Sequence, residues 1–129
     1  DIRILEKFRN VLSDAGFGAI NFTTPEEHDK VIAFTSQLPH IISNAYVKSH
    51  TAVKQKGFSA GSYRDLTRVS KLNEKMWTEL FFENKENLVN EIDFLVDRLS
   101  EYSAALKSND RESLIALLKE GTDSKKQAK

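Results

Sequence analysis

Residues 24–48 read TPEEHDKVIAFTSQLPHIISNAYVK, and this stretch decides the fold. Thr24 can cap a helix with its side chain, and Pro25 suits the first helical position. The apolar residues that follow recur at the three- and four-residue steps of a helix: Val31, Phe34, Leu38, Ile41, Ile42 and Ala45. The stretch therefore predicts one helix that runs to about residue 48. Pro39 lies inside it, and because proline removes a backbone donor and crowds the carbonyl four residues earlier, we expect a kink there.

The segment before this helix has a different pattern. Residues 2–15 place their apolar side chains on one helical stripe, and Gly16 ends that run. Residues 17–23, FGAINFT, are short and apolar, so we expect one strand there. Because a lone strand leaves its edges unpaired, this helix and strand look like the last piece of something larger.

Helical patterns continue after the loop-like middle of the chain. A helix is expected from about Ser62 to Ser70, and another from Asn73, whose side chain can cap it. A seam with alternating steps of four and three follows, which is a heptad pattern over about three repeats. Its members are Leu88, Ile92, Leu95, Leu99, Tyr102 and Leu106.

The C-terminal region predicts one more helix and a tail. The helix is expected to be capped by Asn109 or Ser108 and closed by Gly121, and residues 122–129 are expected to form a disordered tail. Together these patterns predict an all-α bundle of about five or six helices, with a long kinked helix and a dimerising helix. The helix and strand at the N-terminus add to this bundle.

Composition narrows the classes of function. The 129 residues include 19 basic and 19 acidic side chains, so net charge gives no case for binding nucleic acid or an anionic membrane. No apolar run approaches the ~20 residues that span a bilayer. The chain has no cysteine, which fits a reducing cytoplasm. Its three histidines lie far apart in the sequence, so no metal site is predicted.

A cluster of charge stands out at residues 58–70, FSAGSYRDLTRVS. Arg64 and Arg68 are four residues apart and share a helix face, with Asp65 beside them. Two guanidinium groups can clamp a carboxylate or phosphate, and the backbone at Gly61 adds donors at the positive end of the helix. The same residues could instead form a structural ion network. Spacing alone leaves both interpretations open.

Two residues with ring side chains also allow both a structural and a functional interpretation. His40 follows Pro39, so its imidazole could pair with a backbone carbonyl, or it could point into a gap that the kink opens. Trp77 fits a core position, but it could also wall a pocket.

Three blocks resemble one enzyme family. EEHDKVIAFTSQLPHIIS, FSAGSYRDLTRVS and MWTELFFENKENLV are similar, in order and spacing, to the C-terminal helical domain of prephenate dehydrogenases. The resemblance covers roughly residues 20–105. It implies that residues 24–121 are a helical dimerisation and substrate-binding domain. Residues 1–23 would then be the remnant of, or the junction to, an N-terminal Rossmann domain.

The family resemblance also implies an activity. Members oxidise and decarboxylate prephenate to 4-hydroxyphenylpyruvate with NAD or NADP, on the route to tyrosine, and they form homodimers. The cofactor and the catalytic histidine base belong to the Rossmann domain. We therefore expect no catalytic residue and no cofactor site in this chain. Gly16 and Gly18 agree, because they precede the predicted strand and lack the third glycine of a dinucleotide-binding loop.

The resemblance implies roles for the residues singled out above. Arg68 matches the arginine that binds a substrate carboxylate, and His40 matches a histidine near the substrate. The remaining matched positions lie close to the pocket: Arg64, Asp65, Gly61 and Trp77. Gln37 departs from the family, which has a histidine there, so a role that needs an ionisable group at this position is in doubt.

Two alternatives stay open. A relative that acts on arogenate would share all of these residues. A helical interaction module is the other alternative, in which the seam from Leu88 to Leu106 would bind a partner helix.

Overall fold

The computed structural model describes residues 1–55, 57–58 and 61–128, and every regular element among them is a helix or a helical turn. The predicted all-α class is thus confirmed for this part of the chain. The elements, in order, are α1 (Ile2–Asp14), α2 (Pro25–Ile32), a π-helical segment (Ala33–Gln37), α3 (Leu38–Tyr46), a 3-10 turn (Ala52–Lys54), α4 (Gly61–Thr67), α5 (Glu74–Glu83), α6 (Lys85–Lys107) and α7 (Arg111–Gln127).

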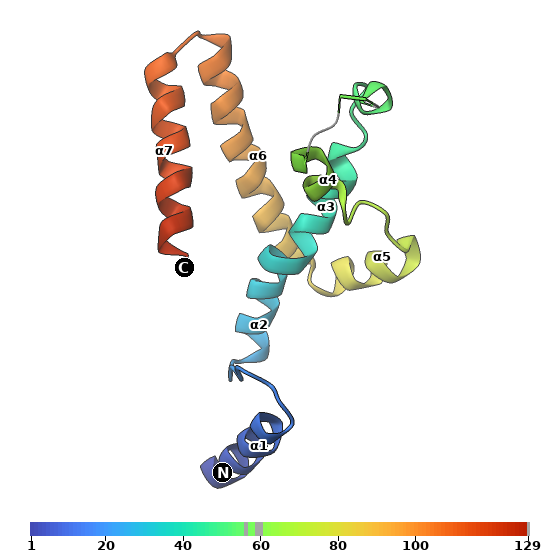
Figure 1. Ribbon diagram of the computed structural model, residues 1–129, viewed down its shortest axis with the longest axis vertical. Coiled ribbons are helices and arrows are strands. Elements are labelled where there is room, and N and C mark those ends of the chain that lie inside the picture. The colour runs from blue at the N-terminus through green and yellow to red at the C-terminus, as the bar shows by residue number, and fades with distance from the viewer. Residues whose placement is uncertain (56, 59–60, 129) are drawn as a thin grey trace.

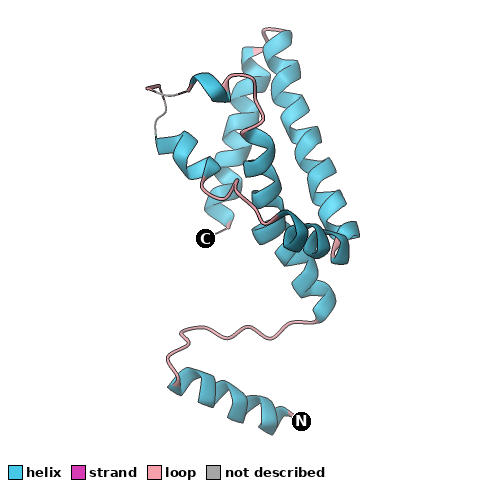
Figure 2. Cartoon of the chain, turned by 90° about the vertical axis from the view of Figure 1, so that its right-hand side faces the viewer, coloured by secondary structure: helices cyan, strands magenta, loops and turns pink. Residues whose placement is uncertain are grey.

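The long helix α6 organises the bundle (Figure 1). It pairs with α7 as a hairpin and also packs against α2, the π segment, α3 and α5. Helix α4 lies on α3. Helix α1 stands apart at the N-terminal end, joined by an extended segment, and buries none of its residues (Figure 2).

The start of α2 forms as its sequence predicts. The Thr24 hydroxyl accepts a hydrogen bond from the backbone N–H of Glu27 at 3.2 Å, and Pro25 occupies the first turn. Glu26 and Glu27 lie near the positive end of the helix dipole, where acidic side chains are favourable.

The kink expected at Pro39 takes the form of the π segment directly before it. The N–H of Leu38 bonds to the carbonyl of Ala33, a step of five residues where an α-helix has four. The Thr35 hydroxyl donates to the carbonyl of Val31 at 2.7 Å. The widened turn thus passes continuously into α3 with Pro39 in its first turn.

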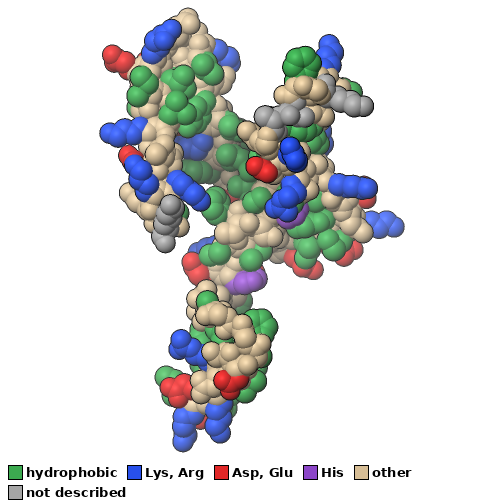
Figure 3. Space-filling view, viewed as in Figure 1, with side chains coloured by type: hydrophobic (Ala, Val, Ile, Leu, Met, Phe, Trp, Pro, Cys, Tyr) green, Lys and Arg blue, Asp and Glu red, His purple; other side chains and the backbone are tan. Residues whose placement is uncertain are grey.

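The buried core is small and has two parts. Ala33 and Leu38, in the chain from α2 to α3, and Leu88, near the start of α6, are buried. Ala105 is buried near the other end of α6, beside α7. The heptad seam of α6 is buried at Leu88 but exposed at Leu99 and Leu106, so this chain alone does not cover the seam. Large apolar side chains are spread over the visible surface (Figure 3).

The predicted strand at residues 17–23 was wrong. The chain leaves α1 through Gly16, which has a φ of +94°, and the N–H of Phe17 bonds back to the carbonyl of Leu12. Residues 19–24 have no regular structure. A strand needs a neighbour to pair its backbone groups, and no strand occurs elsewhere in the described residues.

The last helix also differs from the prediction at both ends. Asp110, not Asn109 or Ser108, is its cap, while Asn109 adopts a left-handed φ of +57° at the corner. The helix continues past Gly121 to Gln127, so residues 122–127 are not a disordered tail. A glycine inside a helix costs only ~1 kcal/mol, and no proline follows to stop the chain.

Helix α4 is shorter than expected at its C-terminal end. It ends at Thr67, so Arg68 lies just after the helix and not on its last turn. None of the helices found here is sufficiently long and apolar to cross a bilayer.

Candidate functional site

The centre of the candidate site is a stacked pair of rings. The imidazole of His40 on α3 lies against the indole of Trp77 on α5, with centroids 4.1 Å apart and planes 30° from parallel. Phe81, one turn further along α5, lies 5.3 Å from Trp77. The aromatic face of α5 is therefore turned toward α3, and His40 is half-buried beneath it.

The π segment fixes the orientation of the imidazole. His40 Nδ1 lies 2.7 Å from the carbonyl oxygen of Ser36. A carbonyl can only accept, so Nδ1 must donate, and Nε2 of the neutral ring is left as an acceptor. The pairing with a backbone carbonyl that the sequence suggested is thus present. The gap expected at the kink is filled on one side by Trp77.

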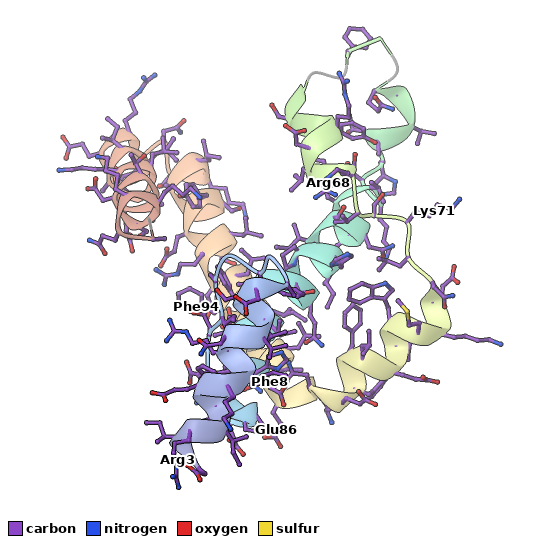
Figure 4. All side chains as sticks on the ribbon, turned by 60° about the horizontal axis from the view of Figure 1, so that its bottom comes forward. Arg3, Phe8, Arg68, Lys71, Glu86 and Phe94 are labelled. Atoms are coloured by element: carbon purple, nitrogen blue, oxygen red, sulfur yellow. The ribbon has the colours of Figure 1, made fainter. Side chains whose placement is uncertain are left out.

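Asn44 joins this face of α3 to the segment that follows α4. Its side-chain Nδ2 donates to the carbonyl of Ser70 at 3.0 Å. Asn44 lies four residues after His40, so both side chains share one helix face. Arg68 lies just after the end of α4 and two residues before Ser70 in the sequence (Figure 4).

A cavity of about 290 Å³ lies between the anchored segment and α5. Its lining is mixed, with aromatic walls from Trp77 and Phe81 and polar groups from Asn44, Ser70 and Lys71. An aromatic wall with a few polar groups is the usual character of a small-molecule site.

The charged cluster of residues 58–70 is exposed. Arg64, Asp65 and Arg68 are all solvent-accessible, as is Gly61. None of the three charged side chains forms an ion pair or hydrogen bond with another residue in the described part of the chain. The structural ion network is therefore not formed among the described residues.

The structure thus brings His40 and Trp77 into direct contact. Arg68 is exposed, lies two residues before the Ser70 that Asn44 binds, and is not among the residues that line the cavity. No hydrogen bond or ring contact links Arg64, Asp65 or Gly61 to the stacked pair in the described part of the chain. Sequence reasoning missed Asn44, although its spacing of four from His40 could have indicated it.

Gln37 is a buried structural residue in this chain. It is 6% exposed, and its amide bonds to Leu80 and Asn84. The doubt about an ionisable role at this position is supported, because a neutral amide fully engaged inside the fold has no such role.

Neither a cluster of metal-ligating side chains nor a strand occurs in the described residues. They contain no group of three or more His, Asp or Glu side chains placed to hold a metal. A dinucleotide-binding loop lies between a strand and a helix, and the described ranges have no strand. We therefore assign no cofactor step to residues of this chain.

Comparisons with known proteins identify the family of the chain. A model of the prephenate dehydrogenase dimerization domain matches residues 24–120. The cyclohexadienyl dehydrogenase of Zymomonas mobilis is 34% identical over 111 residues, which is 80% of this chain and 37% of that protein. The chain thus spans about a third of this curated relative.

Solved structures share the fold. Prephenate dehydrogenase of Aquifex aeolicus, solved with hydroxyphenyl propionate and NAD+, has a TM-score of 0.79 and 29% identity, covering 100% of this chain and 46% of that one. Arogenate dehydrogenase of Synechocystis has a TM-score of 0.83, covering 100% and 49%; at 21% identity it shows the fold alone. With the family model matched along residues 24–120, the chain belongs to the prephenate dehydrogenase dimerization-domain family.

Proposed function

We propose that this chain is the substrate-binding and dimerising part of a prephenate dehydrogenase. The single observation that carries the proposal is the placement of Arg68. Its guanidinium has no partner among the described residues, and its segment is anchored by Asn44 next to the His40–Trp77 stack. In the proposal, the complete enzyme oxidises and decarboxylates prephenate in the biosynthesis of tyrosine.

The chemistry of prephenate suits this placement. The molecule carries one carboxylate on its six-membered ring and another on its pyruvyl side chain. A guanidinium can donate two parallel hydrogen bonds to one carboxylate. We assign this clamp to Arg68. His40 Nε2 and the Trp77 face provide a polar and an aromatic surface beside the ring. Arg64, Asp65 and Gly61 stay in the proposal as residues at the rim of the pocket.

Different parts of the enzyme would supply the groups that the overall reaction needs. A hydride leaves the ring carbinol carbon for NAD+ or NADP+, the hydroxyl proton goes to a base, and the ring carboxylate departs as carbon dioxide. The electrons of that broken carbon–carbon bond make the ring aromatic, and the ring oxygen regains a proton to give the phenol of the product. Residues 24–121 would hold and orient the substrate for this step. The cofactor and the base would come from a Rossmann domain, and residues 1–23 would join the two parts.

The exposed apolar groove between α3 and α6 supports a homodimer. Its volume is about 340 Å³, and its lining is almost wholly apolar, from Ile41, Ile42 and Ala45 on α3 and from Ile92, Leu95 and Leu99 on α6. An uncovered apolar surface of this kind marks a protein interface. We propose that a second copy of the chain covers it. The description of the matching family model, a dimerization domain, supports self-association.

An assay of the complete enzyme tests the proposed function. We expect reduction of NAD+ or NADP+ that depends on prephenate, with 4-hydroxyphenylpyruvate and carbon dioxide as products. Turnover of arogenate but not of prephenate would mean that the substrate is arogenate, the amino-acid analogue of prephenate. No turnover of either compound, by folded enzyme with both cofactors, would contradict the proposal. We place the enzyme in the cytoplasm, which the cysteine-free sequence supports.

A further inference from the structure

A buried pair of amides lies directly behind the His40–Trp77 stack. Gln37 is 6% exposed and Asn84 is 9% exposed, and their side chains bond to each other through Asn84 Nδ2 and Gln37 Oε1 at 3.0 Å. Buried polar side chains must satisfy their hydrogen bonds inside the fold. This pair does so by reaching two backbone carbonyls.

Those two carbonyls determine how both amides are oriented. Gln37 Nε2 donates to the carbonyl of Leu80 at 3.1 Å, and Asn84 Nδ2 donates to the carbonyl of Asp29 at 2.7 Å. A carbonyl accepts and never donates, so each amide must turn its nitrogen toward it. Gln37 is then left with its oxygen for Asn84, and position 37 needs one donor and one acceptor at once.

The pair connects the elements that carry the two rings. Gln37 ends the π segment, one turn before His40, and Leu80 lies on α5, one turn after Trp77. The bond from Gln37 to Leu80 therefore fixes how α5 sits on the helix that carries His40. Asn84, between α5 and α6, adds a third connection to α2 through Asp29.

We propose that Gln37 and Asn84 are positioning residues that hold the His40–Trp77 stack in register for substrate. This inference rests on the proposed function only for its effect on kinetics. Neither amide touches the substrate in the proposal: both act through the placement of α5 on α3. The requirement at position 37 is a donor and an acceptor, and not an amide as such. A neutral imidazole offers both, whereas a carboxylate offers acceptors only.

The test compares three substitutions of Gln37 by spectroscopy and kinetics. Trp77 is the only tryptophan of the chain, so near-ultraviolet circular dichroism and acrylamide quenching of its emission report the stack directly. We expect Gln37→Leu and Gln37→Glu to weaken the near-ultraviolet signal and to expose Trp77 to acrylamide. Gln37→His should preserve both signals. Ser100→Ala, which removes only a hydroxyl bond along the exposed face of α6, is the matched control.

In the complete enzyme, the same variants should change KM more than kcat. We expect Gln37→Leu and Gln37→Glu to raise KM for prephenate about tenfold, equivalent to ~1.4 kcal/mol, with a smaller change in kcat. We expect the Gln37→His enzyme to have the same KM as the unmodified enzyme. A folded Gln37→Leu enzyme with unchanged near-ultraviolet signal and KM would overturn the proposal. If that variant does not fold, a folded Gln37→His protein that behaves like Gln37→Glu overturns it instead.

The two readouts keep this inference separate from the proposed function. If the spectroscopic pattern appears but the complete enzyme turns over no prephenate, the positioning pair stands and the proposed function falls. If prephenate is turned over while all three variants leave the Trp77 signals and KM unchanged, the proposed function stands and the positioning pair falls.

Discussion

Leu88 carries much of the contact between α6 and the chain that crosses it. It is 3% exposed, whereas Leu106 on the same helix is 63% exposed. We predict that Leu88→Ala lowers the free energy of unfolding by about 2–5 kcal/mol, because the truncation leaves a cavity in a small core. Leu106→Ala is the matched control and should change it by less than about 0.5 kcal/mol. Urea denaturation followed by far-ultraviolet circular dichroism measures both, and equal losses would show that Leu88 is not a core residue.

Single residues were partly predictable from the sequence. His40 and Trp77 were both identified as candidate site residues, although either could have had only a structural role in the core. Their contact depends on how α5 sits on α3, which no local pattern encodes. The same holds for Asn44 and Gln37, whose partners lie 26 and 43 residues away along the chain. Side chains that bond to distant backbone groups have no sequence signature.

At the scale of the elements, the corner between α6 and α7 contains a carboxyl group with a lowered pKa. Asp110 caps α7 by accepting hydrogen bonds from the backbone N–H of Ser113 at 3.0 Å and from its hydroxyl at 2.7 Å. These bonds to the backbone and side chain of Ser113 lower the pKa of the Asp110 carboxyl from its ordinary value of 3.8.

This shift predicts how the stability of the corner depends on pH. A carboxyl with a lowered pKa in the folded state stabilises the fold fully above pH 3.8, and the contribution is lost as pH falls below that value through the folded-state pKa. Asp110→Asn keeps an effective cap but cannot titrate. We therefore expect the Tm of the unmodified chain to fall more steeply than that of Asp110→Asn below pH 3.8. Parallel Tm curves in thermal scans would contradict the role of Asp110.

Element starts were more predictable than element ends. Thr24 and Asn73 were both identified as caps, because a capping side chain is a local signal, and Asn73 Oδ1 accepts from Met76 N–H at 3.1 Å as expected. Gly121 failed as a stop signal, because a glycine ends a helix only where the chain turns left-handed after it. The kink at Pro39 was foreseen, but its π form depends on where the surrounding carbonyls find partners.

At the scale of the whole molecule, the apolar groove between α3 and α6 is uncovered in the single chain, and this feature leads to a prediction about assembly. Leu99 lines the groove and is 59% exposed in the single chain. We predict that Leu99→Asp yields a monomer of unchanged helicity, because a charge buried at an interface without a partner opposes association. Sedimentation velocity measures the mass of both proteins.

The outcomes distinguish three assemblies. A dimer for the unmodified chain and a monomer for Leu99→Asp support the proposed homodimer. A dimer for both proteins would show that the interface lies outside the groove. A monomer for both at high concentration would contradict self-association, and capture of a foreign helical peptide by the groove would favour an interaction module. The heptad seam indicated an apolar face on α6, but not whether this chain or another would cover it.

The central claim is that Arg68 binds a carboxylate of the substrate, and steady-state kinetics of the complete enzyme tests it most directly. We predict that Arg68→Ala lowers kcat/KM for prephenate by a factor equivalent to about 2–4 kcal/mol, since a carboxylate in the site would lose its charge-assisted partner. Lys75→Ala, which removes an exposed cation of α5 that does not line the cavity, is the control for general electrostatics and should cost far less. A folded Arg68→Ala enzyme with the kcat/KM of the unmodified protein would contradict the account.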